Sequence, residues 1–418
     1  MFKLKKLFRN IKGSEVVEKM MMVIASVTLF AVGIGFMNKF INSAIENQIG
    51  DNSHQIELPN GNASGNIGGN TGGQGGTVTP KPETPGPEGE DNSLLYGTVY
   101  NDFNYKKINT NNLVNAQGEL IKNPIIAEIK NELYVMGGVD TSRAEKPNDK
   151  IYKYNLSTNN FDFFMDMPSE FLTQKYAMSL ALTYNVVNDK LYVFGGGPTG
   201  NFNEVLKFDP SAKTFEIVAT YPDNIAKFST TVVKDDTIYC FGGFDLQTQT
   251  IYDSIYSFDT NNNTFTKETD AKYNTALSAG ALVGNKIYLF GGLDRFTNET
   301  LSTSIIEYNI TTKTLTKVGD LPVGLASFSV VNIDNILYVI GGQDTTSDTY
   351  ASKKIYSFDT RNMEVGELNN TFGNGTYGQP VAIINNKIYT MPYPSSDVET
   401  ELYEITLIKS ESNIGGTN

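Results

Sequence analysis

The chain of 418 residues contains one cysteine, one histidine, four arginines and no tryptophan. The single Cys240 excludes an intramolecular disulfide and every cysteine-based zinc or iron–sulfur pattern. The single His54 excludes a histidine-rich metal site and disfavours a histidine-based catalytic triad. These absences remove most familiar enzyme classes, so we expect no catalytic residues, no metal site and no cofactor.

Basic residues are scarce outside the N-terminal segment. The whole chain carries 33 Lys and Arg against 46 Asp and Glu, a net charge of −13. Residues 1–50 hold seven of the basic and three of the acidic residues, so the remainder has a net charge of −17. Its only arginines are Arg143, Arg295 and Arg361. An acidic body of this kind cannot neutralise phosphates, which excludes nucleic acid as a partner.

One long uncharged run is present near the N-terminus. Residues 20–37 are eighteen residues without a charge, and a helix of that length spans about 27 Å, close to the hydrocarbon core of a bilayer. We predict a transmembrane helix over 20–41 after a basic cytoplasmic leader, 1–19. The positive-inside rule then places residues 50–418 outside the cytoplasm, at the cell surface. The alternative is a cleaved secretory signal, for which Asn42-Ser43-Ala44 is a weak cleavage site.

The residues just before this run support a third interpretation. Gly13 and Ser14 follow the basic leader, and Glu18 lies five positions after Gly13. This pattern resembles the signal of type IV and Flp-type prepilins. The resemblance implies cleavage after Gly13, a new N-terminus at Ser14, and a Glu18 retained for assembly into a pilus-like filament. A retained anchor, secretory cleavage and pilin-type cleavage all remain open at this point.

The segment after the apolar run is poor in residues that can form a core. Residues 61–76 contain eight Gly, and residues 80–87 contain four Pro. Such composition cannot bury enough apolar area to fold, so residues 50–93 should be a disordered linker. A coil of about 44 residues has an end-to-end distance of about 35–40 Å. We therefore expect a tether, followed by a folded domain at 94–409 and a flexible tail at 410–418.

The folded part is repetitive. Five segments end in a double glycine after an alternating apolar strand, with first glycines spaced 58, 47, 49 and 50 residues apart. The pairs are Gly137-Gly138, Gly195-Gly196, Gly242-Gly243, Gly291-Gly292 and Gly341-Gly342. A sixth segment, Ile388–Tyr393, has lost both glycines. A fixed period near 50 residues is typical of a repeat architecture.

A second motif follows each glycine pair: an aromatic residue, turn-forming residues, and an apolar residue seven positions after the aromatic. The pairs are Tyr154/Phe161, Phe208/Phe215, Phe258/Phe265, Tyr308/Leu315 and Phe358/Val365. This spacing predicts a strand, a tight turn and a strand. Each repeat therefore contributes four short strands, which form one antiparallel sheet.

These motifs resemble the Kelch repeat, which implies an all-β fold: a six-bladed β-propeller over residues 94–409 with a central channel. Kelch repeats usually carry Trp at the last motif position, where this chain has Phe, Leu or Val. The last blade has only three C-terminal strands, within Gln379–Ile408. Because an unpaired sheet edge is a liability, we predict that Gly97–Asn109 supplies its outer strand and closes the ring.

Candidate ligand-binding residues lie in loops that the Kelch resemblance places on one face. Asp140, Asp245, Asp294 and Asp344 each follow a glycine pair by two residues, and are either turn caps or an acidic ring at the channel mouth. Basic–aromatic pairs precede three inner strands: Lys175-Tyr176, Lys227-Phe228 and Lys272-Tyr273. Arg143 and Arg295 lie in loops after glycine pairs. Cys240 occupies the position of Val135 and Val193 in other repeats, so we expect it to be buried.

Three functions fit this organisation. The first is a membrane-tethered, non-catalytic binding protein whose propeller recognises a protein or glycan ligand. The second is a minor pilin-like subunit that carries the propeller. The third is an enzyme of Kelch type, since the family includes copper radical oxidases and sialic-acid mutarotases. Oxidase chemistry requires histidine ligands, which the domain lacks. A mutarotase-like site would need Arg143 or Arg295 with acid–base carboxylates. We prefer the first.

Overall fold

The computed structural model describes residues 96–114, 118, 120–122, 124–140, 148–172, 183–195, 203–222, 229–245, 250–273, 276–293, 301–344, 351–373, 375, 380–392 and 401–409. The leader, the apolar span, the pilin-like motif and the linker predicted for residues 1–93 lie outside these ranges, as does the tail. Within these ranges, no helix is long and apolar enough to cross a membrane.

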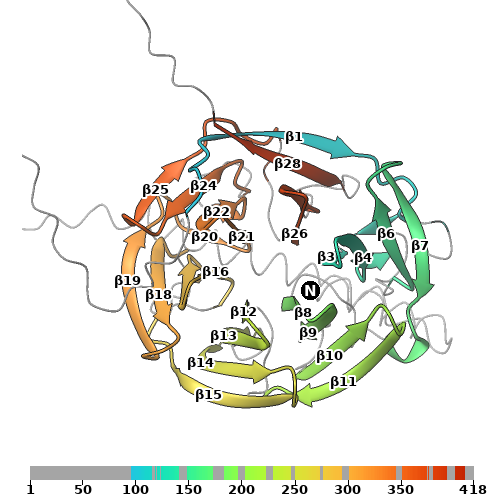
Figure 1. Cartoon of the computed structure of the whole chain (residues 1–418), viewed down its shortest axis with the longest axis horizontal. Coiled ribbons are helices and arrows are strands. Elements are labelled where there is room, and N and C mark those ends of the chain that lie inside the picture. The colour runs from blue at the N-terminus through green and yellow to red at the C-terminus, as the bar shows by residue number, and fades with distance from the viewer. Residues whose placement is uncertain are drawn as a thin grey trace, which may run out of the picture.

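Six four-stranded antiparallel sheets surround a common centre, as predicted (Figure 1). Blade 1 consists of β3 (Ile125–Ile129), β4 (Glu132–Met136), β6 (Lys150–Asn155) and β7 (Asn160–Asp166). Blade 2 consists of β8 (Thr183–Val187), β9 (Lys190–Phe194), β10 (Glu204–Asp209) and β11 (Thr214–Thr220). Blade 3 consists of β12 (Thr230–Lys234), β13 (Thr237–Asp245), β14 (Thr250–Asp259) and β15 (Thr264–Asp270).

Blades 4 to 6 complete the ring. Blade 4 consists of β16 (Ala279–Val283), β17 (Lys286–Phe290), β18 (Ser304–Asn309) and β19 (Thr314–Asp320). Blade 5 consists of β21 (Ser329–Ile333), β22 (Ile336–Ile340), β24 (Ile355–Asp359) and β25 (Glu364–Glu367). Blade 6 consists of β26 (Val381–Ile384), β27 (Lys387–Thr390), β28 (Leu402–Ile408) and β1 (Asp102–Ile108). In each blade the first strand lies nearest the centre and the fourth forms the perimeter.

Short elements accompany the blades. They are β2 (Ile121–Lys122) paired with β5 (Val139–Asp140), β20 (Leu325–Ala326) paired with β23 (Gln343–Asp344), and the 3₁₀ helix η2 (Ser169–Phe171).

The ring closes through the N-terminal strand. β1 pairs with β28 in an unbroken antiparallel register from Asp102↔Ile408 to Ile108↔Leu402. The sequence prediction for Gly97–Asn109 is therefore confirmed. Blade 6 combines residues from both ends of the propeller, so its backbone groups pair like those of the other blades.

The first and second strands of every blade are joined by two residues. In four blades both residues have positive φ, as a type I′ turn requires, and most of them are Asn or Asp, which tolerate that conformation. They are Lys130-Asn131, Asn188-Asp189, Asp334-Asn335 and Asn385-Asn386. This turn follows the right-handed twist of the strands and fixes their register.

The third and fourth strands are joined by four residues in blades 1 to 5. The last residue of the third strand closes each turn with its side chain. The Asp209 Oδ1 atom accepts hydrogen bonds from the N–H groups of Ser211 and Ala212 at 2.9 and 3.1 Å. Asn309 does the same for Thr311 and Thr312, both at 3.0 Å. The repeated Asp or Asn after the aromatic is therefore an Asx-turn residue.

The core lies between neighbouring blades. At the position where Kelch repeats carry Trp, Phe215 stacks on Phe208 with ring centroids 4.5 Å apart, and Phe265 lies 4.7 Å from Phe258. Two smaller rings thus replace one large one. Cys240 is fully buried among residues of blades 2 and 3, as predicted, and burial raises the pKa of its thiol.

The glycine pairs allow close approach between successive blades. The Gly291 backbone has φ +57°, and a Cβ there would lie 2.4 Å from the carbonyl oxygen of Leu325, in the chain that leads into blade 5. The N–H of Gly292 donates to that same carbonyl at 2.8 Å. A side chain at Gly291 would force the two blades apart.

Blade 6 is regular although it lacks the glycine pair. Pro392 stands at the position of the first glycine and is buried, and two residues earlier the Thr390 hydroxyl donates to the carbonyl of Pro380 at 2.9 Å. A side-chain hydrogen bond thus holds the connection that leads into this blade.

Candidate functional site

The propeller has two unlike faces. Because the strands of a blade alternate in direction, the connections between strands one and two and between strands three and four lie on one face, which we call the turn face. The other connections lie on the opposite face. It carries the glycine pairs, and we call it the glycine face. Turn-face connections have two or four residues, whereas glycine-face connections have four to sixteen. Long connections on a rigid scaffold are the usual place for binding residues.

Repeated hydrogen bonds fix the base of three glycine-face loops. The backbone N–H groups of Asn148, Ser302 and Ser352 donate to the carbonyls of Gly138, Gly292 and Gly342 at 3.0, 2.8 and 2.7 Å. The side-chain oxygen of each accepts from the N–H two residues later. These three residues are not among the candidates predicted from the sequence. Their signature is an Asn or Ser three positions before the Ile that opens the second motif.

Three of the predicted aspartates lie in β-ladders rather than in turns. Asp140 pairs with Ile121 between β5 and β2, Asp245 with Thr250 at the end of the blade 3 hairpin, and Asp344 with Leu325 between β23 and β20. They share the glycine face, as the resemblance implied. The Asp344 side chain is only 6% exposed. Its charge adds to burial in raising the pKa of Tyr356.

One predicted basic–aromatic pair falls within the described residues. Lys272 is exposed on the connection from blade 3 to blade 4, while Tyr273 is half-buried and packs against the cluster between those blades. Lys272 is thus open to solvent, and Tyr273 supports the loop. The remaining candidates lie outside the described residues: Arg143, Lys175, Tyr176, Gly196, Lys227, Phe228, Asp294 and Arg295.

On the turn face, polar side chains bond to one another. The Asp236 carboxylate accepts hydrogen bonds from the side-chain amides of Asn188 at 2.8 Å and Asn261 at 3.1 Å. Those two hydrogen bonds lower the pKa of Asp236. Asn188 belongs to blade 2 and Asp236 to blade 3, so the contact ties neighbouring blades together. Such mutual satisfaction favours a structural role for this face.

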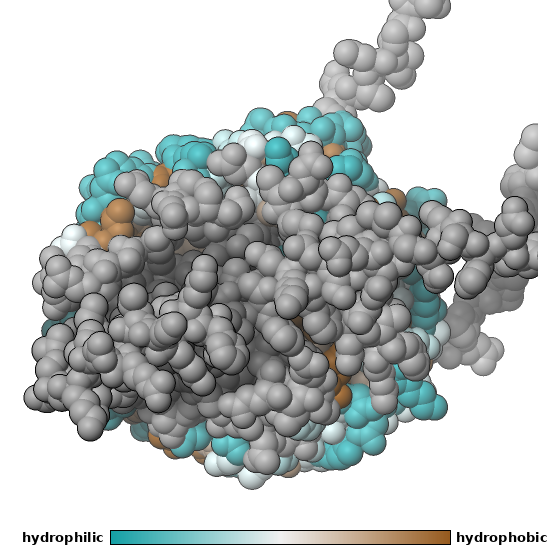
Figure 2. All heavy atoms as spheres, turned by 180° about the vertical axis from the view of Figure 1, so that it is seen from behind, coloured by the Kyte–Doolittle hydropathy of each residue, from teal (hydrophilic) through white to brown (hydrophobic). Residues whose placement is uncertain are grey.

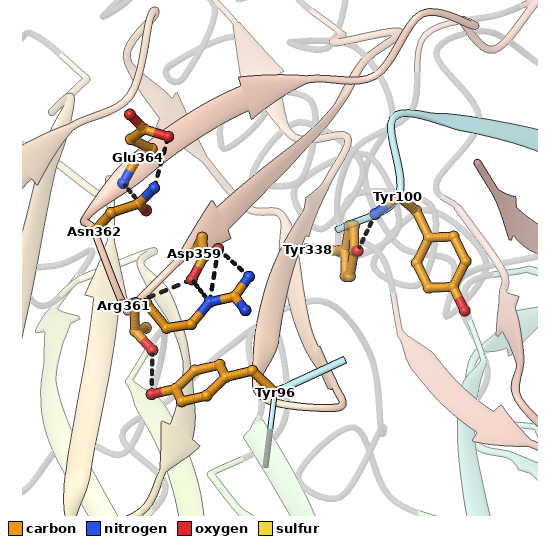
Figure 3. Close-up of polar contacts among 8 residues, drawn as sticks. Tyr96, Tyr100, Tyr338, Asp359, Arg361, Asn362 and Glu364 are labelled. Atoms are coloured by element: carbon orange, nitrogen blue, oxygen red, sulfur yellow. Dashed lines mark hydrogen bonds and ion pairs between the residues drawn. The ribbon is translucent and has the colours of Figure 1, made fainter. Parts of the chain in front are cut away.

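The chain reaches the ring along the turn face. Residues 96–101, which we call the strap, lead from blade 5, where Tyr96 lies, to the start of β1 in blade 6 (Figure 3). The Gly97 N–H donates to the carbonyl of Asp334 at 2.8 Å, and the Tyr100 N–H donates to the hydroxyl of Tyr338 at 2.9 Å. The Asn101 carbonyl accepts from the N–H of Asn369 at 2.8 Å. Burial raises the pKa of Tyr338 to about 12, so its hydroxyl stays neutral at physiological pH.

The outer end of the strap rests on the last turn of blade 5. The Tyr96 hydroxyl lies 3.1 Å from the Thr360 hydroxyl, and the Arg361 guanidinium lies over the Tyr96 ring at 5.1 Å. Arg361 also pairs with Asp359 (Figure 3). Hydrogen bonds from Arg361 hold the pKa of Asp359 below its ordinary value despite partial burial. The strap is therefore held at Tyr96 and Gly97 by turn-face connections of blade 5, and at Asn101 by the connection from blade 5 to blade 6.

The outer strands of different blades expose different kinds of side chain at one equivalent position. At equivalent positions of the outer strands, blades 1 and 2 expose Phe163 (55%) and Ile217 (48%), where blades 3 and 4 carry Lys267 and Lys317. Elsewhere the described perimeter is mostly hydrophilic (Figure 2). Lysines on outer strands discourage edge-to-edge association.

No group of three or more His, Cys, Asp or Glu side chains in the described ranges is placed to hold a metal ion. What the arrangement offers is a rigid ring that carries long loops on one face and holds its own chain on the other.

Comparison with known proteins agrees with this architecture. Residues 133–391 match the family described as Attractin/LZTR1 beta-propeller, a stretch that runs from β4 to the end of β27. Over 184 residues the chain is 26% identical to a Candida albicans protein named tRNA wybutosine-synthesizing protein 4. That match covers 42% of this chain and only 25% of the relative. The chain belongs to the Attractin/LZTR1 beta-propeller family, whose Kelch-type propellers are generally protein-interaction modules.

Proposed function

We propose that this protein is a membrane-tethered, extracytoplasmic binding protein whose propeller recognises a protein or glycan ligand through its glycine face. The proposal assigns no catalytic step and no cofactor. The ligand contacts would come from the loops after the glycine pairs and from those before the inner strands, with Lys272 as the exposed contact among the described residues.

The observation that carries the proposal is the position of the strap. The antiparallel register places Asp102 beside Ile408 at the turn face, so both ends of the domain leave the ring there. The outer end of the strap then contacts the turn-face residues Asp334 and Thr360 of blade 5. A chain anchored through its N-terminus is thus held by the turn face. The glycine face, with the longer loops, points away from the anchor and toward whatever the cell meets.

Topology is the first test. The apolar run and its basic flank predict that residues 50–418 lie outside the cytoplasm. Protease added to intact cells should cut the Gly/Pro-rich linker and release a fragment of about 35–40 kDa, since linkers of this composition are preferred cleavage sites. Complete protection in intact cells, with cleavage after lysis, would contradict an extracytoplasmic head.

Binding is the second test. The fluorescently labelled full-length chain in detergent should bind a subset of a printed glycan array or a defined fraction of cell-surface proteins. Heat-denatured chain is the control. Turnover of a sugar substrate, such as faster anomer exchange followed by NMR, with no retained ligand would overturn the proposal in favour of an enzyme.

The pilin-like motif supports a more specific variant, in which the propeller is displayed on a filament. Gly13→Val should then block processing, whereas Glu18→Ala should permit cleavage but impair assembly. N-terminal sequencing of protein from native membranes decides. Ser14 supports the variant, Met1 indicates a plain anchor, and a residue near Ile45 indicates secretion.

The tRNA-related name of the Candida albicans protein does not guide the proposal. The match spans a quarter of that protein, and the body of this chain is acidic with three arginines, which disfavours binding to a phosphate backbone.

A further inference from the structure

The outer strands of the six blades form the perimeter of the ring, and each has one edge that pairs with no other strand among the residues that the structure describes. Figure 1 shows these strands running along the perimeter close to the plane of the ring. The N–H and C=O groups of the free edge therefore point outward, away from the centre. Such an edge can pair with a strand of another molecule unless it is protected.

Four blades protect this edge in ways that proteins commonly use. The outer strands of blades 3 and 4 carry Lys267 and Lys317, each paired with an aspartate three residues later at 2.7 and 2.8 Å. The outer strand of blade 5, β25, is only four residues long. In blade 6, β1 exposes Lys106 and Lys107, and the side-chain amide of Asn370 donates to one of its carbonyls at 2.7 Å. Lysines, short strands and covering loops all discourage edge-to-edge association.

Blades 1 and 2 differ from these four. Their outer strands, β7 and β11, have seven residues each and contain neither lysine nor proline. Where blades 3 and 4 have lysine, blade 1 exposes Phe163 and blade 2 exposes Ile217. Phe164 and Met165, which follow Phe163, are half-buried, so β7 presents three consecutive large apolar side chains. The β-bulge at this point recurs in blades 1 to 4 and does not set blade 1 apart.

The acidic side chains of β7 are compensated within the chain. Asp166 pairs with Lys150 at 2.5 Å, and Asp162 accepts a hydrogen bond from the side-chain amide of Asn155 at 3.0 Å. The Lys150 ammonium also lies 5.0 Å from the centre of the Phe163 ring. Because residues 51–418 carry a net charge of −17, most of the surface repels a second copy of the chain. At β7 both carboxylates already have a donor, so this edge is apolar and carries no uncompensated charge.

We propose that the edge of β7 is a self-association surface through which two copies of this chain form a two-fold symmetric dimer. The strand lies close to the plane of the ring (Figure 1), so a two-fold axis perpendicular to that plane reverses its direction. The two copies of β7 then meet as antiparallel strands, and Phe163, the central residue of the strand, lies opposite its copy.

This symmetry also fits the way the chain enters the ring. An axis perpendicular to the ring keeps the turn faces of both copies on one side, so both straps leave toward the same side. Two anchors in one membrane are therefore compatible with the dimer, and both glycine faces stay open. The inference does not require the proposed binding function.

The mass of the full-length chain in detergent tests the proposal. Light scattering after size exclusion, corrected for bound detergent, should give a dimer for the wild type. Phe163→Lys places on β7 the lysine that blades 3 and 4 carry. It should raise the dissociation constant by about tenfold or more, because an apolar contact is lost and two lysines face each other across the axis. Leu156→Lys, in the four-residue turn of the same blade, is the control. It replaces an apolar side chain that is 38% exposed and should leave the dimer intact.

Crosslinking locates the contact. Asp162→Cys places a thiol beside the centre of β7, and Thr266→Cys places one at the equivalent position of β15 in blade 3. The native Cys240 is fully buried and stays unlabelled. A short bis-maleimide should link two Asp162→Cys chains but not two Thr266→Cys chains.

A monomeric wild type would overturn the proposal, as would a dimer that Phe163→Lys leaves unchanged, since such a dimer forms through another part of the chain. Equal crosslinking of the two cysteine variants would also contradict it. A monomer whose Asp162→Cys label is shielded only by added lipid vesicles would assign this surface to a bilayer instead. None of these measurements uses a ligand, so failure of the dimer and failure of the proposed binding function are separate results.

Discussion

The turn face and the glycine face are made by the same repeat but obey different rules. On the turn face every connection has two or four residues, and Asx turns close the four-residue ones. On the glycine face the connections vary up to fourfold in length, although Asn148, Ser302 and Ser352 fix the base of three of them. Hydrogen-bonded turns of constant length therefore build the scaffold on one face. On the opposite face the loops vary in length, although hydrogen bonds fix the base of three of them.

The largest expected effect concerns the strand that joins the two faces in blade 6. Deleting residues 94–109 removes the strap and β1, which leaves the β28 edge unpaired and exposes aromatic side chains such as Phe372. We expect loss of cooperative unfolding or a much lower Tm. Deleting 60–90, in the linker, is the matched control and should leave Tm unchanged. Equal Tm values for the two deletions, by circular dichroism, would refute N-terminal closure.

The next effect tests the close approach at the glycine face. Gly291→Ala places a methyl group 2.4 Å from the Leu325 carbonyl at positive φ, which should cost at least about 2 kcal/mol of unfolding free energy. Gly319→Ala, in the same blade, is the control because its Cβ would lie 3.5 Å from Ile305 in ordinary contact. Urea unfolding measures both. A Gly291→Ala protein as stable as the control would show that the blades can move apart freely.

A smaller effect is expected on the turn face. Asp209→Ala leaves the N–H groups of Ser211 and Ala212 without their acceptor and should cost about 1 kcal/mol. Asn309→Ala in blade 4 should cost about as much, since that turn has the same hydrogen bonds.

The two turns differ in their response to pH. Burial opposes ionisation of Asp209, but the backbone hydrogen bonds and Lys190 outweigh it, so its pKa lies below the ordinary value of 3.8. A carboxyl group whose pKa is lower in the folded than in the unfolded protein stabilises the fold at pH values above its unfolded-state pKa. This stabilisation is lost as the pH falls through the folded-state pKa. The stability difference between wild type and Asp209→Ala should therefore shrink below about pH 4, while that for Asn309→Ala should not. Parallel pH profiles would contradict this assignment.

The smallest effect on stability is expected at the candidate site itself. Lys272 is exposed on the glycine face, so Lys272→Ala should change the unfolding free energy by less than about 0.5 kcal/mol. A larger loss in thermal or urea unfolding would show that Lys272 supports the fold and is not free for a ligand.

Much of the fold could be predicted because its determinants are local and repeated. The glycine pairs, the aromatic seven residues before an apolar partner, and the unassigned strand at Gly97–Asn109 gave the number of blades and their closure. Cys240 was placed by its equivalence to Val135. Each of these inferences needs only a comparison of one repeat with another.

Non-repeated contacts could not be predicted in this way. The hydrogen bond between Tyr100 and Tyr338 joins residues 238 positions apart, and it has no counterpart in the other repeats among the residues that the structure describes. The pairing of Asp344 with Leu325 is repeated in that of Asp140 with Ile121, but each ribbon has only two residues per strand, too short to give a sequence pattern. Most candidate ligand contacts lie in loops outside the described residues, so they remain predictions.

The central claim is that the glycine face binds the ligand and that the turn face lies toward the N-terminal anchor. Charge reversal of one exposed lysine on each face tests it most directly: Lys272→Glu on the glycine face and Lys130→Glu on the turn face. Both chains are compared with wild type for affinity to the array or surface-protein ligand that wild type retains, at equal folded fraction. We predict that Lys272→Glu weakens binding by about tenfold, the loss of one charge-assisted hydrogen bond, and that Lys130→Glu leaves it unchanged. Weaker binding for Lys130→Glu alone would place the ligand on the turn face and contradict the account.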